Sequence, residues 1–159
     1  MFRVAIITLS DKGARGERED ETGRVVAEMV KALPGEVVSY EVLPDEEDLL
    51  EAKLKTLADD EEVDLILTNG GTGLSPRDIT PDATARVIDK VVPGIVHAMI
   101  QAGLEKTPTA MLSRAMAGVR GRSLIVNLPG SPKAARESLE AILPALAHGM
   151  EKIRGDEQE

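Results

Sequence analysis

The segment with the clearest capacity for chemistry is a glycine-rich turn near the middle of the chain. It reads Thr-Asn-Gly-Gly-Thr-Gly over residues 68–73 and follows the short apolar run 65–67. Three glycines in four residues leave backbone N–H groups without side-chain cover, so the turn can wrap a small anion or let a ligand come close. The sequence therefore predicts phosphate contacts at Gly70, Gly71, Thr72 and Gly73.

Two common phosphate-binding loops do not fit this turn. No Lys follows the glycines, as a P-loop requires, and Pro76 stands where the dinucleotide fingerprint needs a third glycine. The turn instead leads into an Arg-Asp pair, Arg77 and Asp78. Thr80 is then placed to cap a helix, and Pro81 to occupy its first turn, where a missing N–H is harmless.

Strands and helices alternate in the first half of the chain, and they must position this turn. Residues 2–9, 36–43 and 63–68 read as strands, and the first has the continuous apolar character of a buried parallel strand. Helices are predicted over 23–33, with Thr22 as the cap, and from Pro44-Asp45 to about residue 58. This βαβαβ order predicts an α/β fold, a three-layer α/β/α sandwich with a mostly parallel sheet and right-handed crossovers.

Ligands of such sheets bind at the carboxyl ends of the strands. Ser10-Asp11, Pro44-Asp45 and the glycine turn all fall at such ends, so three distant segments are predicted to meet at one pocket.

The second half of the chain is predicted to be mainly helical. Helices are expected over 81–90, 95–104 and 133–143, with Ser131 and Pro132 starting the third, Pro144 interrupting it and a last helical segment at 145–153. Residues 119–123 look like a turn into a strand at 124–128, and 109–114 is ambiguous between helix and strand. The chain is predicted to form one domain over 1–159, with 155–159 frayed.

Composition narrows the classes of function. The chain has 159 residues, a net charge of −9 and no Cys, which excludes disulfides, thiolate metal sites and a Cys nucleophile. The acidic balance argues against nucleic-acid binding. No signal peptide or membrane span is apparent, so a cytoplasmic protein is expected. Phe2 and Tyr40 are the only aromatic residues, so a flat ligand cannot rely on stacking.

Several of the polar residues also have plain structural interpretations. Asp45 stands where a helix N-cap stands, and Asp78 could order its own loop through an Asx-turn. Asp82 suits the first turn of a helix, where an acid complements the dipole. Arg77 could be solvated or could steer phosphate. Ser131 and Lys133 begin a helix after Pro129-Gly130. The sequence leaves open whether they cap that helix or contact a phosphate.

The glycine turn, at its spacing from Arg-Asp and Thr-Pro, resembles the molybdopterin-binding domain family. The resemblance extends from Val4 to about Arg154, through these further motifs: Ser10-Asp11, Gly16 with Asp20-Glu21-Thr22-Gly23, Pro44-Asp45, Leu112-Ser113-Arg114 and the run Asn127 to Pro132. It implies a three-layer domain, a homotrimer and an enzyme that joins AMP from ATP to the terminal phosphate of molybdopterin, releasing pyrophosphate. Two carboxylates are implicated in that family, and they match Asp45 and Asp78.

The chemistry that the resemblance implies is reasonable for these residues. The second pKa of a phosphate monoester is about 6, so the attacking group is ionised at neutral pH and needs no general base. Charge on the leaving pyrophosphate calls for amide cradles, an Arg or Lys, and a metal ion. Asp45 and Asp78 supply hard oxygen ligands suited to Mg²⁺. Phosphate or substrate contacts are further expected at Ser10, Asp11, Gly70, Gly71, Thr72, Gly73, Arg77, Ser113, Arg114, Pro129, Gly130, Ser131 and Lys133.

Two alternatives to an adenylyltransferase stay open. One is a paralogue that binds a pterin or nucleotide without turnover, and the other is a nucleotide or pyrophosphate hydrolase on the same domain. The presence of both Asp45 and Asp78 argues against the first. The resemblance also implies a downstream partner, a molybdenum insertase. The apolar stretch from Ile95 to Met116 independently favours a homo-oligomer, because one small domain would not bury it fully.

Overall fold

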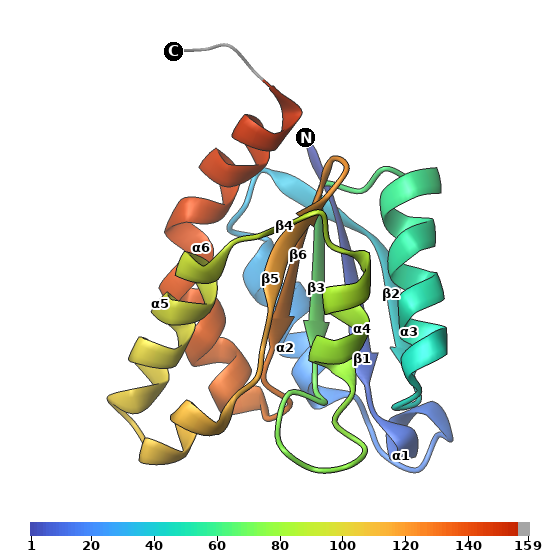
Figure 1. Cartoon of the computed structure of the whole chain (residues 1–159), viewed down its shortest axis with the longest axis vertical. Coiled ribbons are helices and arrows are strands. Elements are labelled where there is room, and N and C mark those ends of the chain that lie inside the picture. Colours follow the sequence, from blue (N-terminus) through green and yellow to red (C-terminus); the bar gives the residue numbers. More distant parts are fainter. Residues whose placement is uncertain (156–159) are drawn as a thin grey trace.

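A six-stranded sheet forms the centre of the computed structural model, which describes residues 1–155. The strand order is β2-β1-β3-β6-β5-β4 (Figure 1). The strands are β1 (Phe2–Leu9), β2 (Gly35–Leu43), β3 (Leu65–Asn69), β4 (Lys90–Val91), β5 (Ala117–Arg120) and β6 (Ser123–Leu128). Four of them, β2, β1, β3 and β6, run parallel, and β5 and β4 continue the sheet in antiparallel fashion. The predicted α/β class and the mostly parallel sheet are confirmed.

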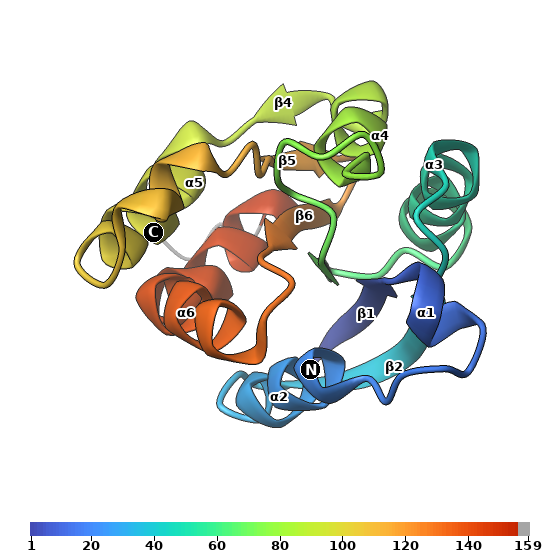
Figure 2. The same ribbon diagram turned by 90° about the horizontal axis from the view of Figure 1, so that it is seen from below.

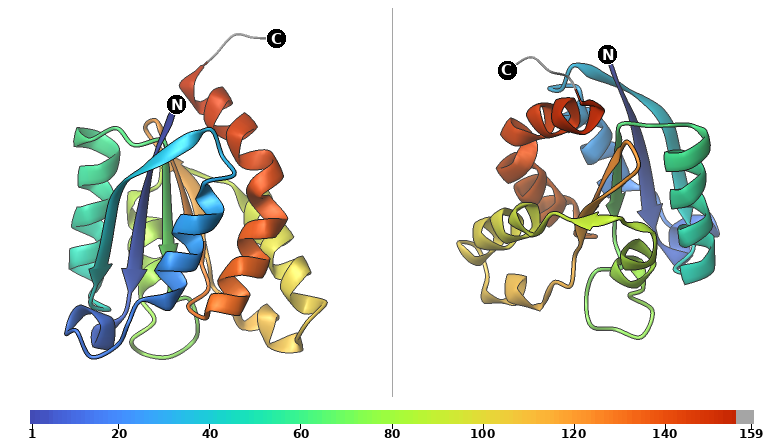
Figure 3. Two further views of the ribbon diagram at one scale, coloured as in Figure 1. Left: turned by 180° about the vertical axis from the view of Figure 1, so that it is seen from behind. Right: turned by 45° about the horizontal axis from the view of Figure 1, so that its top comes forward.

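Helices cover both faces of this sheet, as the three-layer prediction requires. The elements are α1 (Asp11–Ala14), α2 (Glu21–Val30), α3 (Glu47–Lys55), a π-helical turn η1 (Thr56–Asp60), α4 (Thr80–Val87), α5 (Pro93–Leu104), a 3₁₀ turn η2 (Pro108–Leu112) and α6 (Pro132–Arg154). The helices α2, α5 and α6 lie on one face, with α2 beside α6, whereas α3 and α4 lie on the other (Figures 2 and 3).

Each layer buries its own aliphatic core against the sheet. On one face, Val26 of α2 and Leu139 of α6 pack with Ile6 and Leu67. On the other, Leu50 of α3 and Val87 of α4 pack with Ile7. Successive residues of a strand point to opposite faces, so a strand such as Ala5-Ile6-Ile7 is apolar throughout because both of its faces are covered. Within residues 1–155, none of the helices has the length and apolar character needed to cross a membrane.

Two predicted helix caps are wrong. Asp20, not Thr22, caps α2, because its carboxylate accepts a hydrogen bond from Gly23 N–H. Thr80 lies inside the first turn of α4 and its hydroxyl donates to the carbonyl of Gly70 at 2.8 Å. Both threonines are buried, and each uses its hydroxyl to satisfy a carbonyl of another segment instead of its own helix.

Three other predictions are corrected in the second half of the chain. Pro144 does not interrupt α6, because buried Ile142 and Leu146 hold the helix to the core on either side of an exposed proline. The helix predicted to reach residue 90 ends at Val87, and strand β4 follows. Residues 117–123 form a strand and a tight turn, since β5 and β6 pair as a hairpin. The ambiguous segment contains the 3₁₀ turn η2.

Gly155, the first residue of the tail predicted to be frayed, is held by the end of α6. Gly155 ends α6 as its C-cap with a φ of 77°, a left-handed conformation that glycine adopts without a steric penalty. Its N–H donates to the carbonyls of Glu151 and Lys152. Residues 156–159, which the same prediction covers, lie outside the described part of the chain.

Candidate active site

A large cavity opens at the carboxyl ends of the parallel strands, where the sequence placed the site. Its volume is about 1130 Å³. The ends of β1 and β3, the loop before α2, the glycine turn and the start of α6 all contribute to its wall, and they meet at the lower end of the sheet in Figure 1. The predicted residues that line it are Ser10, Asp11, Asp45, Gly70, Gly71, Asp78, Gly130 and Ser131.

The other predicted residues lie beyond this cavity. A second, smaller cavity of about 270 Å³ lies on the far side of the glycine turn, between α5, η2 and α6, and Thr72, Gly73, Ser113 and Pro129 line it. Arg77, Arg114 and Lys133 line neither cavity. The glycine turn therefore separates two hollows, and the predicted site residues divide between them.

Asp11 and Asp45 brace the ends of β1 and β2 against each other. Asp11 N–H donates to the carboxylate of Asp45 at 3.1 Å, and Asp45 N–H donates to the carboxylate of Asp11 at 2.9 Å. Arg77 reaches across from the glycine loop and donates from Nε and Nη2 to Asp11, at 2.9–3.1 Å. Arg77 is thus neither simply solvated nor directed at the cavity, because it is paired with a carboxylate.

The two carboxyl groups differ in their electrostatic surroundings. The hydrogen bonds from Arg77 hold the pKa of Asp11 below its ordinary value. Burial raises the pKa of Asp45, and the nearby negative charges of Asp11 and Asp78 raise it further. A partly buried carboxylate near two others is the kind of group whose ionised form a cation stabilises strongly. The structural interpretation of Asp45 as the cap of α3 is wrong, since Glu46 is the N-cap and no side chain caps that helix.

Asp78 orders its own loop, as predicted, but not through an Asx-turn, because its bond runs back to residue 75 and not to the backbone two residues on. Its carboxylate accepts a hydrogen bond from Ser75 N–H at 3.0 Å. Arg114 closes the same loop from the other side, because it donates to the carbonyls of Gly73 and Asp78 and pairs with Asp82 at 3.1 Å. Asp82 does lie in the first turn of α4, as predicted. The geometry places Arg114 as a clamp on the loop that carries Asp78.

The glycines of the turn are required by its backbone. Gly70 and Gly71 have φ values of 98° and 69°, and a Cβ on Gly70 would lie 2.5 Å from the carbonyl oxygen of Leu9. Within residues 1–155, the backbone N–H groups of 71–74 have no hydrogen-bond acceptor. They are therefore available as donors, which is what the sequence pattern predicted for an anion-binding turn.

Ser10 and Ser131 are helix caps. Ser10 accepts from Gly13 N–H at the start of α1, and Ser131 accepts from Ala134 N–H at the start of α6. Both also line the large cavity, so each cap positions a helix start next to the glycine turn. Lys133 is exposed on the first turn of α6.

A family model described as "Probable molybdopterin binding domain" matches residues 5–148. The chain belongs to the molybdopterin-binding domain family. The molybdopterin adenylyltransferase of Helicobacter pylori strain J99 is 41% identical over 157 residues, 98% of this chain and 89% of that protein. The Escherichia coli K12 protein of the same name is 38% identical over 156 residues, 94% and 80% of the two chains. A crystal structure of the Thermus molybdopterin biosynthesis enzyme MoaB has a TM-score of 0.93 and 55% identity, over 100% of both chains.

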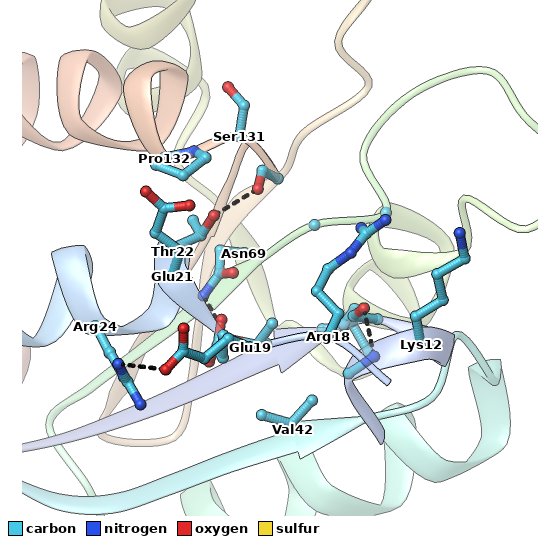
Figure 4. A pocket seen from close by; sticks show the side chains of 18 of the residues that line it. Lys12, Arg18, Glu19, Glu21, Thr22, Arg24, Val42, Asn69, Ser131 and Pro132 are labelled. Carbon is cyan, nitrogen blue, oxygen red and sulfur yellow. Dashed lines mark hydrogen bonds and ion pairs between the residues drawn. The ribbon is translucent and has the colours of Figure 1, made fainter. Parts of the chain in front are cut away.

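This molybdopterin-binding domain also contains cavity residues that the sequence did not single out as site residues. Figure 4 shows Lys12, Arg18, Arg24 and Asn69 among the side chains that line the cavity. The basic residues were obscured by the overall charge of −9, which says nothing of local charge. Asp20 also lines the cavity, and the motif Asp20 to Gly23 was a usable signal for it. Nothing in the sequence signalled Asn69, because its importance depends on neighbours far away along the chain.

Proposed function

We propose that this chain is a molybdopterin adenylyltransferase. It transfers AMP from ATP to the terminal phosphate of molybdopterin and releases pyrophosphate. The structural observation that carries the proposal is the position of two carboxylates beside the glycine turn. A Cβ on Gly71 would lie 3.3 Å from Asp45 Oδ1, and a Cβ on Gly73 would lie 2.9 Å from Asp78 Oδ2. The similarity to adenylyltransferases over nearly the whole chain supports the same activity.

The reaction needs positioning and charge neutralisation more than proton transfer. A terminal phosphate oxygen of molybdopterin attacks the α-phosphorus of ATP, a new P–O bond forms, and the bond to the β-phosphate breaks as pyrophosphate leaves. The attacking monoester is already ionised at neutral pH, so no general base is required. The free N–H groups of 71–74 and the helix start at Ser131 are donors available to the phosphates.

The carboxylates present fit a Mg²⁺ ion. Within residues 1–155, no group of three His, Cys, Asp or Glu side chains forms a complete metal cage. Mg²⁺ in nucleotide enzymes is bound through one or two carboxylates together with substrate phosphates and water, and Asp45 and Asp78 lie near enough for the charge of Asp78 to raise the pKa of Asp45. We propose that these two residues hold the ion, which neutralises triphosphate charge when bound.

The remaining expectations complete the proposal. The chain acts as one domain, works in the cytoplasm, assembles as a homotrimer and hands its product to a molybdenum insertase. The trimer is supported by α5 and η2, which leave Leu104, Met111 and Leu112 43%, 62% and 50% exposed. Met111 lies within the apolar stretch 95–116 and is not a core residue.

The decisive experiment is incubation of the purified protein with molybdopterin, ATP and Mg²⁺. Adenylylated molybdopterin and an equal amount of pyrophosphate are expected. Release of AMP or ADP without molybdopterin would identify a hydrolase. Binding of either substrate without any product would identify a binding paralogue. Either of these outcomes overturns the proposed function.

A further inference from the structure

Asn69 is a buried polar residue that the proposed mechanism leaves without a role. It is the last residue of β3, its side chain is 1% exposed, and it lines the large cavity immediately before Gly70 (Figure 4). Its Oδ1 atom is fully buried and is the one such side-chain atom within residues 1–155 that has no hydrogen-bond partner. An unpaired buried amide carbonyl destabilises a protein, so native folds rarely retain one.

Neighbouring hydrogen bonds fix which way the Asn69 amide points. Thr8 donates its hydroxyl hydrogen to the Asp20 carboxylate at 2.7 Å, and Tyr40 donates to the same carboxylate oxygen. The Thr8 oxygen is then free only to accept, and it does so from Asn69 Nδ2 at 3.0 Å. An inverted Asn69 amide would set its carbonyl against a hydroxyl oxygen that has no hydrogen left to give. Oδ1 therefore points away from this network.

A second buried asparagine shows what full pairing looks like in this fold. Asn127 lies on the adjacent strand β6, where it is in register with Thr68, the residue before Asn69. Its Nδ2 donates to the hydroxyls of Thr68 and Thr84, and its Oδ1 accepts from Met116 N–H, all at 3.0 Å. The protein satisfies both ends of one buried amide and only one end of the other. Asn127 lines the smaller cavity, whereas Asn69, with its unpaired Oδ1, lines the large one.

We propose that Asn69 Oδ1 accepts a hydrogen bond from an N–H or O–H group of the bound substrate and so selects the substrate by that donor. Phosphate oxygens are acceptors, so Asn69 Oδ1 cannot bind them and must contact another part of the ligand. The neighbouring N–H groups of 71–74 have the opposite preference, because they are donors. Asn69 Oδ1 and these N–H groups together orient a ligand that carries phosphate at one end and an N–H or O–H group at the other.

Rejection of the wrong ligand is the main effect of such a residue. A site built to pair with a substrate hydroxyl or amine strongly disfavours an analogue that lacks it, because the buried protein group is then left unpaired. Two sources of the donor are consistent with the proposed function: the ribose and base of ATP, or the ring N–H and amine groups of the pterin. Which of the two substrates carries the donor is decided by the experiment below.

The test measures equilibrium binding of each substrate separately, so that no turnover is needed. Asn69→Leu removes both ends of the amide and keeps the branching at Cγ, and Asn69→Ala makes the same removal if the larger leucine side chain prevents folding. Thr84→Val is the matched control, because it removes a buried hydroxyl that pairs with the other asparagine, Asn127, lines neither cavity and leaves the Asn69 amide and its bond to Thr8 in place. The ligands are ATP, 2′-deoxy-ATP, 3′-deoxy-ATP, purine riboside triphosphate, which lacks the amine, and molybdopterin.

We expect Asn69→Leu to weaken binding of one substrate roughly tenfold, the equivalent of one hydrogen bond to a buried group. If that substrate is ATP, the analogue that lacks the donor binds the wild-type protein roughly tenfold more weakly than ATP does. The Asn69→Leu variant then binds ATP and this analogue with equal affinity. If it is molybdopterin, all the ATP analogues keep the same relative affinities in both proteins. Thr84→Val retains the discrimination. Unchanged affinity of the Asn69 variants for both substrates, or a Thr84→Val variant that loses discrimination equally, overturns the assignment.

The inference uses the proposed function to name its ligands, and the two can fail separately. Adenylylated product with neutral Asn69 variants contradicts only the role of Asn69. Selective binding through Asn69 without any product contradicts only the proposed activity. Absence of binding by both substrates contradicts both.

Discussion

Asp11 and Asp45 exchange backbone-to-carboxylate hydrogen bonds, each donating its N–H to the side chain of the other. The pair joins the residues that follow β1 and β2, two strands that lie side by side in the sheet. Arg77 draws Asp11 toward the glycine loop, whereas Asp45 keeps its raised pKa next to the turn. Because Arg77 pairs with Asp11 and not with Asp45, the negative charge of Asp45 is less compensated than that of Asp11.

Replacement of Asp45 by Asn is expected to remove activity and preserve the fold. The Asn carbonyl can still accept from Asp11 N–H, but the charge that a Mg²⁺ ion needs is gone. Loss of one preorganised electrostatic contact reduces turnover by about 10²–10³. Asp45→Ala should lose activity alike and also some stability, because Asp11 N–H loses its acceptor.

Steady-state kinetics and a magnesium titration check this expectation. Asp60→Asn is the control, since it removes an exposed carboxylate of the η1 turn, away from the cavity, and should be fully active. A fully active Asp45→Asn enzyme with the normal magnesium requirement would show that Asp45 serves only to brace the strands.

Replacement of Asp78 by Asn separates loop order from catalysis. Asn retains an oxygen that accepts from Ser75 N–H, so the loop should survive, while adenylyl transfer falls by about 10²–10³. Asp78→Ala should lose the loop geometry as well. Thermal melts measured together with turnover per folded molecule distinguish the two effects. If Asp78→Asn melts several degrees lower and turns over normally, Asp78 is structural and not catalytic.

A methyl group on Gly70 is expected to destabilise the whole protein. Left-handed backbone costs a non-glycine residue about 1–2 kcal/mol, and the new Cβ would also meet the Leu9 carbonyl at 2.5 Å, so Gly70→Ala should lose more than about 2 kcal/mol. Gly16→Ala provides a matched control, because Gly16 has a φ of 75° but no atom within 4 Å of the new Cβ. The denaturant midpoints of the two variants are compared. Equal losses of stability would mean that the close contact between the new Cβ and the Leu9 carbonyl is unimportant.

Asp64 is expected to be the carboxylate on which stability depends most. It is 5% exposed and accepts from Arg154 at 2.9–3.0 Å and from Arg3 N–H at 2.8 Å. Breaking a buried ion pair costs 3–5 kcal/mol, and since the Arg154 side chain is 27% exposed we expect about 3 kcal/mol for Asp64→Asn. Asp59→Asn, which breaks an exposed pair with Arg120, should lose much less.

The contribution of Asp64 should also depend on pH. Burial opposes its ionisation, but the hydrogen bonds from Arg154 and Arg3 outweigh burial and lower its pKa. A lowered pKa in the folded state gives stability that is present above the ordinary aspartate pKa and is lost as the pH falls through the folded value. The difference in unfolding free energy between wild type and Asp64→Asn should therefore shrink in acid. A difference that stays constant with pH would contradict this assignment.

The apolar surface of α5 and η2 is expected to form a trimer interface. Light scattering should give about three times the chain mass of 17.0 kDa at micromolar concentration. Leu112→Glu should reduce the mass, because it places a charge in the buried interface. Leu49→Glu is the control, as Leu49 is 47% exposed on α3, on the other face of the sheet. A monomer mass for the wild type would rule out the trimer.

The sequence by itself determined the class of fold and the general place of the site. Continuous apolar strands alternating with amphipathic helices are a local pattern, and Ser10, Asp45 and Gly70 follow strands whose ends must meet at one edge of a parallel sheet. The sequence also predicted the glycine turn, because free N–H groups and left-handed backbone are properties of the glycines themselves.

Only the tertiary structure decided which partner each polar side chain has. Thr80 satisfies the Gly70 carbonyl instead of capping its helix, Arg77 pairs with Asp11, and Arg114 clamps the loop of Asp78 from 36 residues away. The short strand β4 exists because β5 offers it an edge, and not because of its own two residues. Asn69 differs from Asn127 only in its surroundings. Hydrogen-bond partners and burial are set by which segments pack together, and that information is not contained in the spacing of residues along the chain.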